Sequence, residues 1–221
     1  MLIGVKKRFV FIANSKTAST SIESTLVTHA EIQRGGNSQR KHIYLRNALI
    51  EYDFLFGRKG FGIDRFFTFG VMRDPVDWIT SWYRYRKGNK VESPLPPKMS
   101  LAGFWALNDW NRSFPDGTPR LQRSFFTDAN DNPIVDYIIP YEALDSHFAV
   151  ICRALKVNAP LREENVSTLK EAEVPPALAE EMRAFYANDY ALRAQIPQIN
   201  AAGLAKLAAR QIKNGAASTH K

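Results

Sequence analysis

Residues that could bind an anion follow the first apolar run of the chain. Phe9–Ala13 is rich in aromatic and β-branched side chains, which is typical of a buried strand. Ile22 and Leu26 then recur at the spacing of one helix face. A helix N-terminus offers unpaired N–H groups and the positive end of a dipole. This strand–loop–helix stretch therefore predicts a phosphate-binding site built by Ser15, Lys16, Thr17, Ala18, Ser19, Thr20 and Ser21.

This stretch differs from the phosphate loop of nucleoside triphosphatases. That loop follows the pattern G-x-x-x-x-G-K-[ST], whereas residues 10–17 contain no glycine. Taken alone, the stretch is also explained as a helix N-terminus that happens to be rich in serine and threonine.

A second strand, turn and helix begin at Phe66. The run 66–72 predicts another buried strand, and Arg73 ends it. Asp74 is a favoured N-cap and Pro75 a favoured first helical residue. Val76, Ile79 and Tyr83 continue at helical spacing. Since ligands of open α/β sheets bind outside the carboxyl ends of the strands, we expect Lys16 and Arg73 to lie at one site.

Together, the two stretches resemble the sulfotransferase family that uses 3′-phosphoadenosine-5′-phosphosulfate (PAPS). In that family a Lys-Thr loop holds the 5′-phosphosulfate, as Lys16-Thr17 would here. An Arg-Asp-Pro turn and a serine eight residues after the arginine hold the 3′-phosphate, and Arg73 and Ser81 have this spacing. Weaker similarity continues through residues 141–144, 165–167 and 186–189.

The resemblance implies a fold and an activity. The fold would be α/β, a P-loop-like three-layer arrangement with a central, mainly parallel sheet flanked by helices. The activity would be transfer of a sulfuryl group from PAPS to a hydroxyl or amine of an acceptor, with 3′-phosphoadenosine-5′-phosphate (PAP) as product and no metal. Lys16 would be catalytic, stabilising charge on the leaving phosphate. The chain looks most like soluble, bacterial-type members related to carbohydrate sulfotransferases.

Three features depart from the family pattern. Asn14 stands where the family often has proline, and Ala18-Ser19 replaces a common Gly-Gly pair. No glycine-rich, basic late loop is present, so the third nucleotide-contacting segment stays unassigned.

His42 is the predicted general base. Histidine titrates nearest neutral pH, and some sulfotransferases resemble this chain in placing Lys-His, here Lys41-His42, between the two phosphate-binding segments. Carboxylate bases also occur in the family, and Glu51 and Glu142 are the alternatives.

Composition indicates a single domain over residues 1–221, with 214–221 a flexible tail. The net charge is +8, but the acid-free segment after Asp189 supplies +5 of it. A modest positive field suits an anionic cofactor and does not require nucleic acid as a partner.

The lone Cys152 falls on an apolar helical face and is expected to be a buried, inert thiol. The histidines and Cys152 form no ligand-spaced cluster, so no metal site is expected.

The N-terminus lacks a signal-peptide pattern, and no apolar run reaches the roughly 18 residues of a membrane span. A cytoplasmic protein is therefore expected. The acceptor would be a small molecule or saccharide, with a glycan or glycolipid hydroxyl favoured by the resemblance alone. Loops 88–100 and 111–133 would bind the acceptor. In the second loop, Arg120 and Arg123 would either contact an anionic acceptor or be exposed to solvent. The sequence does not indicate an oligomeric state.

Two other functions stay open. An ATP-dependent small-molecule kinase would use the same phosphate cradle with Mg²⁺, and a non-catalytic nucleotide-binding protein would keep the site without turnover. The remaining periodicities predict a strand over 135–140 and helices over 41–52, 101–110, 141–156, 175–194 and 197–213.

Overall fold

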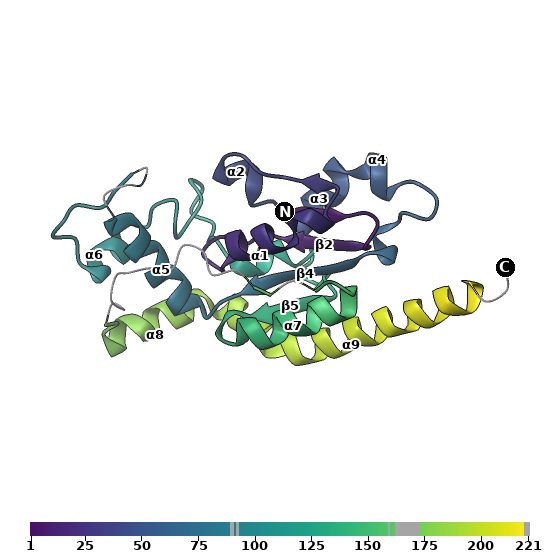
Figure 1. Cartoon of the computed structure of the whole chain (residues 1–221). Coiled ribbons are helices and arrows are strands. Elements are labelled where there is room, and N and C mark those ends of the chain that lie inside the picture. Colours follow the sequence, from purple (N-terminus) through teal and green to yellow (C-terminus); the bar gives the residue numbers. More distant parts are fainter. Residues whose placement is uncertain (89–90, 92, 159, 162–172, 219–221) are drawn as a thin grey trace.

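The computed structural model describes residues 1–88, 91, 93–158, 160–161 and 173–218. These residues form an α/β fold in which helices cover both faces of a five-stranded mixed sheet, compatible with three layers (Figure 1). The strands are β1 Leu2–Gly4, β2 Phe9–Ile12, β3 Ile32–Gln33, β4 Phe67–Met72 and β5 Tyr137–Pro140. The α-helices are α1 Ser19–Leu26, α2 Ser38–Lys41, α3 Leu45–Glu51, α4 Asp53–Phe56, α5 Pro75–Lys87, α6 Leu101–Ala106, α7 Leu144–Leu155, α8 Pro176–Phe185 and α9 Ala187–Ser218.

The sheet has the order β3-β1-β2-β4-β5 and is mixed, so the mainly parallel sheet that the resemblance implied is found in part. β2, β4 and β5 run parallel, but β1 is antiparallel to both β2 and β3. The reason is local, because the four-residue turn after Gly4 leads β1 directly back along β2, and so short a connection can only join antiparallel strands. The parallel half nevertheless contains the two strands that the sequence predicted to carry the site.

Side chains alternate between two cores across the sheet. Phe9, Phe11 and Phe69 point to one face and pack against α1 and α7. Val10 and Ile12 point to the other face, toward α3 and the first half of α9. Every residue of β2 is buried, as its unbroken apolar run predicts. Burying each large apolar side chain contributes about 1.5–3 kcal/mol, which holds the strand ends in fixed register.

A third apolar cluster lies beyond the carboxyl ends of the parallel strands. It joins α5, α6 and α8, which gather at the left of Figure 1. Asp74 caps α5 by accepting hydrogen bonds from the N–H groups of Val76 and Asp77, and Pro75 is the first helical residue, as predicted. Phe104 and Trp105 of α6 are buried in this cluster. The chain leaving β4 is thus anchored on both sides of Arg73.

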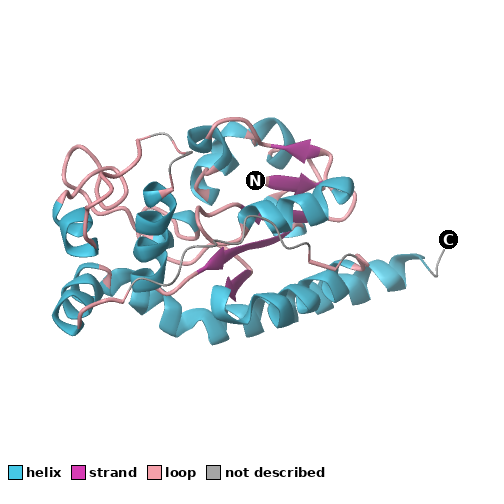
Figure 2. Cartoon of the chain, turned by 60° about the vertical axis from the view of Figure 1, so that its left-hand side comes forward, coloured by secondary structure: helices cyan, strands magenta, loops and turns pink. Residues whose placement is uncertain are grey.

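The last helices differ from the predicted pattern. The helix expected over 175–194 breaks at Tyr186, and α9 then runs unbroken through Pro197 to Ser218. Its backbone includes residues 214–218, which were predicted as a tail. Gly203 lets α9 pack against the segment before β5, since an added Cβ would lie 1.8 Å from the Asp136 carbonyl oxygen. In both Figure 1 and Figure 2 the end of α9 projects beyond the rest of the molecule.

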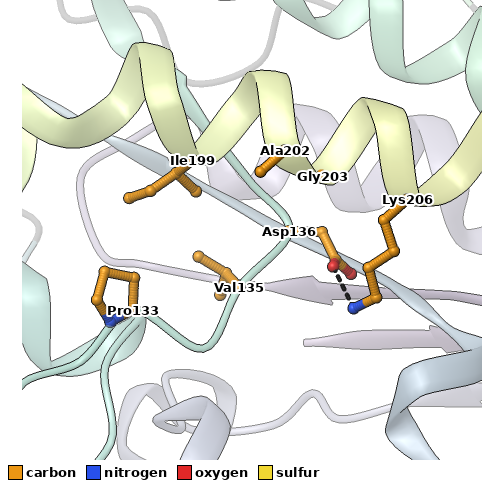
Figure 3. A pocket seen from close by; sticks show the side chains of 7 residues that line it. All are labelled: Pro133, Val135, Asp136, Ile199, Ala202, Gly203 and Lys206. Atoms are coloured by element: carbon orange, nitrogen blue, oxygen red, sulfur yellow. Dashed lines mark hydrogen bonds and ion pairs between the residues drawn. The ribbon is translucent and has the colours of Figure 1, made fainter.

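A pocket beside α9 lies away from the predicted site. Lys206 reaches across it to Asp136, with 2.6 Å between Nζ and Oδ1 (Figure 3). Asp136 precedes β5, so the pocket is at the amino end of that strand. Its lining residues are Pro133, Val135, Asp136, Ile199, Ala202, Gly203 and Lys206.

In the described part of the chain, no helix has the length and apolar character needed to cross a membrane. The predicted similarity at 165–167 falls outside the described residues.

Candidate anion-binding site

The loop after β2 has an unusual backbone. Lys16 and Ala18 have φ angles of 58° and 54°, in the left-handed region that costs a non-glycine residue roughly 1–3 kcal/mol. The Ala18 carbonyl accepts a hydrogen bond from the Ile22 N–H, so α1 starts directly after this turn. Thr17 Oγ1 donates to the Asn14 carbonyl at 3.1 Å and closes the loop internally. The N-terminus of α1 therefore faces the carboxyl end of the sheet.

Lys16 lies against α5 and near two other cations. Its Nζ is 3.9 Å from the centre of the Tyr85 ring and 5.7 Å from that of Trp82. Burial, together with the positive charges of Arg73 and Arg84, lowers the pKa of Lys16 from 10.5 to about 8. The site therefore concentrates positive charge where the sequence predicted an anion.

Arg73 is oriented by contacts on its backbone and its side chain. Its guanidinium carbon lies 4.4 Å from the centre of the Tyr141 ring, just after β5. The Gln122 side chain accepts from the Arg73 N–H at 3.1 Å and donates to the Arg73 carbonyl at 2.9 Å. Among the described residues, the buried Nε of Arg73 has no hydrogen-bond partner. A buried guanidinium donor without a partner is suited to a ligand anion.

A buried polar network holds Gln122 in place. Asn14 Nδ2 donates to Gln122 Oε1 at 3.0 Å and to the Val71 carbonyl at 3.2 Å. The fully buried Asp189 carboxylate accepts from the N–H groups of Gln122 and Arg123, at 3.0 and 2.8 Å. Burial raises the pKa of Asp189 to about 6, against these hydrogen bonds. The network joins the ends of β2 and β4 to α9.

Ser81 lies on the α5 face that carries the cations. Arg84 and Tyr85 follow it by three and four residues, so the three side chains are neighbours on the helix surface. Lys16 contacts Tyr85, which brings the loop after β2 to the same face. Arg84 was not predicted, although its spacing from Ser81 is visible in the sequence. Its Nε is also buried without a hydrogen-bond partner among the described residues.

His42 lies at the end of β2. Its Nδ1 is 2.7 Å from the Ala13 carbonyl oxygen, which can only accept, so Nδ1 carries the proton and Nε2 is the acceptor. Burial lowers the pKa of His42 below 6.5. Lys41 pairs with Glu23 at 2.7 Å and donates to Thr20 Oγ1 at 3.2 Å, which fixes this segment against α1.

The alternative bases have structural partners. Glu51 pairs with Arg34 at 2.6 Å. Glu142 pairs with Arg193 at 3.2 Å and accepts from the Asp74 N–H at 2.8 Å. These contacts account for both carboxylates as ion-pair partners.

Two further predictions can be compared with the structure. Cys152 is buried on the inner face of α7, as expected, and burial raises its pKa. Arg123 pairs with Asp131 at 2.6 Å. Arg120 instead lies 4.1 Å over the Phe114 ring, and no described carboxylate forms an ion pair with it.

Three cationic side chains, a serine and a helix N-terminus therefore gather where the parallel strands end. Such a set can hold a ligand with several negative charges, and the neutral His42 can accept a proton beside it. Comparison of the chain with protein-family models, curated proteins and solved structures found no match.

Proposed function

We propose that this protein is a PAPS-dependent sulfotransferase with a P-loop-like fold. It moves a sulfuryl group from PAPS to a hydroxyl or an amine of a saccharide or other small acceptor. The observation that carries the proposal is the convergence of Lys16, Arg73 and Arg84 on the α5 face that presents Ser81. PAPS carries charge at two separate positions, the 3′-phosphate and the 5′-phosphosulfate, and this set offers cations to both.

Each of the two motifs binds one charged end of the donor. The backbone N–H groups at the start of α1 and the Lys16 ammonium bind the 5′-phosphosulfate. Arg73 and Ser81 bind the 3′-phosphate, and the unpartnered Nε of Arg84 adds a donor on the same helix face. A 3′-phosphate site distinguishes PAPS from ATP, which lacks that group.

Transfer needs in-line positioning, charge stabilisation and a base. The acceptor oxygen attacks sulfur while the bond from sulfur to the bridging phosphate oxygen breaks. Lys16 stabilises the negative charge that develops on that leaving oxygen. His42 Nε2 takes the acceptor proton, because its hydrogen bond to Ala13 fixes the proton on Nδ1.

A thermal-shift comparison of PAP, AMP and ATP with Mg²⁺ tests the proposal. PAP should stabilise the protein most, since a ligand at about 100 times its Kd adds about 2.7 kcal/mol. AMP lacks the 3′-phosphate and should shift the melting temperature much less. Substituting Arg73→Ala should bring the PAP shift down to that of AMP, whereas Arg183→Ala, which removes an exposed ion pair, should not.

Three outcomes would redirect the assignment. Equal shifts from PAP and AMP would remove the 3′-phosphate site. A shift from ATP with Mg²⁺ alone would favour the small-molecule kinase. A PAP shift without sulfuryl transfer to any member of a broad acceptor panel would favour the non-catalytic nucleotide-binding protein.

A further inference from the structure

A second cationic group lies around Tyr44, two residues after His42. It consists of Arg120 and Arg46, with the neutral Tyr44 near both. Arg120 and Arg46 lie close enough to Tyr44 for their charges to act on its hydroxyl. The guanidinium carbon of Arg46 is 4.9 Å from the Tyr44 ring centre, but Arg46 is directed to the carbonyls of Thr127 and Asp128. Arg120 is therefore the cation of this group that a ligand could use.

Tyr44 lies close to His42 along the chain. Ile43 between them is buried in the core, and Tyr44 has extended dihedrals of −70° and 144°. Tyr44 thus follows by two residues the His42 ring, which is held at the end of β2 by the Ala13 carbonyl. The Tyr44 ring packs edge-on against Phe125 at 4.9 Å, which fixes its position.

The backbone directs Arg120 toward the strand ends. Leu121 is extended, with dihedrals of −110° and 137°, and packs into the cluster of α5, α6 and α8. Arg120 and Gln122 therefore project to its other side. Gln122 contacts Asn14 and Arg73 there, so Arg120 approaches the end of β2 from the same side.

The contacts of Arg120 leave its guanidinium available to a ligand. Its guanidinium lies over the Phe114 ring, and its buried Nε has no hydrogen-bond partner among the described residues. No described carboxylate forms an ion pair with it, in contrast to Arg123, which pairs with Asp131. Guanidinium groups bind carboxylate, sulfate and phosphate oxygens in a planar, two-point arrangement.

We infer that the acceptor carries an anionic group, which Arg120 and the Tyr44 hydroxyl hold while His42 faces the attacking hydroxyl. This inference rests on the proposed function and narrows its acceptor to an anionic molecule, such as a sugar bearing a carboxylate, sulfate or phosphate. Neutral acceptors would leave Arg120 without a counter-charge.

Ligand-observed NMR on the PAP-saturated protein tests this site, since PAP blocks the donor cations. The probes are methyl glucuronoside, glucose 6-sulfate and glucose 6-phosphate, with methyl glucoside as the uncharged control. At least one charged probe should bind roughly ten- to a hundredfold more tightly than the control, the usual worth of a charge-assisted hydrogen bond. The probe that binds best identifies which anion the acceptor carries.

Two substitutions and a matched control locate the effect. Arg120→Ala should abolish the preference for charged sugars, and Tyr44→Phe, which removes only the hydroxyl, should reduce it. Arg123→Ala removes an arginine from the same segment and should leave the preference intact. All three should bind PAP like the wild type, which also shows that they are folded.

Each contrary result is distinct. The inference is wrong if no charged probe binds better than methyl glucoside, if the preference survives Arg120→Ala, or if Arg123→Ala removes it equally. Failure of PAP to bind in the same samples would contradict the donor site instead. In that case, a loss of charged-sugar binding in Arg120→Ala but not in Arg123→Ala would still support the anion site.

Discussion

The lowered pKa of Lys16 leads to an unusual expectation, that removing a predicted catalytic charge stabilises the free protein. The shift from 10.5 to about 8 corresponds to about 3 kcal/mol against the ammonium, at 1.36 kcal/mol per pKa unit. Lys16 is half-buried, so solvent screens part of this cost, and the contact with Tyr85 returns about 0.5–2 kcal/mol. About 1–2 kcal/mol of destabilisation therefore remains.

The substitution Lys16→Met keeps the apolar stem against Tyr85 and removes the charge. It should raise the melting temperature of the free protein by a few degrees at pH 7, since 1 kcal/mol corresponds to about 2–4 °C in a domain of this size. Lys59→Met at an exposed position is the control and should change stability by less than about 0.5 kcal/mol. With PAP bound the order should reverse, because the phosphates favour the ammonium.

The pH dependence has a definite sign. The folded pKa lies below the unfolded one, so the unfolded chain binds more protons between about 8 and 10.5. The destabilisation is complete below about pH 8 and fades as the pH rises toward 10.5. The stability gap between Lys16→Met and wild type should therefore shrink across that interval in thermal or urea unfolding. A constant gap, or a less stable variant at pH 7, would refute the assigned environment of Lys16.

Two further substitutions test the residues around the donor site. His42→Ala should lower turnover by roughly 10²–10⁴-fold, the usual contribution of a positioned base, and should leave PAP binding unchanged. In the wild type, activity should be lost as the pH falls through the pKa of His42, which burial lowers below 6.5. Asp189→Asn replaces an acceptor of two buried N–H groups, so it should cost about 1–3 kcal/mol in urea unfolding and weaken PAP binding, while Asp131→Asn should do neither. Normal turnover in the first variant, or normal PAP affinity in the second, would contradict the roles given to these residues.

Local patterns predicted the segments that carry the site. The apolar run before Asn14 became β2, and the Asp74-Pro75 pair begins α5 as its capping chemistry requires. These features depend on neighbours in the sequence, so one sequence suffices to find them. Arg84 could also have been found, because it lies three residues after Ser81 on the same helix face.

Other features depend on contacts between distant segments. β1 and β3 are short, and they form strands because they pair with each other and because β1 also pairs with β2. Pro197 removes one N–H from α9, yet the helix continues because Leu192 and Ile196 before it and Leu204 after it pack on the sheet. Asp189 and Gln122 are 67 residues apart, and no periodicity connects them.

The end of β2 explains why Asn14 occupies a position where the resembled family often has proline. Three consecutive residues there tether three segments of the site: the Ala13 carbonyl holds His42, the Asn14 side chain holds Gln122, and the Ser15 carbonyl accepts from Trp78 Nε1 at 2.8 Å. Proline would remove the middle tether, and with it the link from β2 through Gln122 to Arg73. The proposed donor and acceptor sides then both depend on this one strand end, so a displacement of it would move both together.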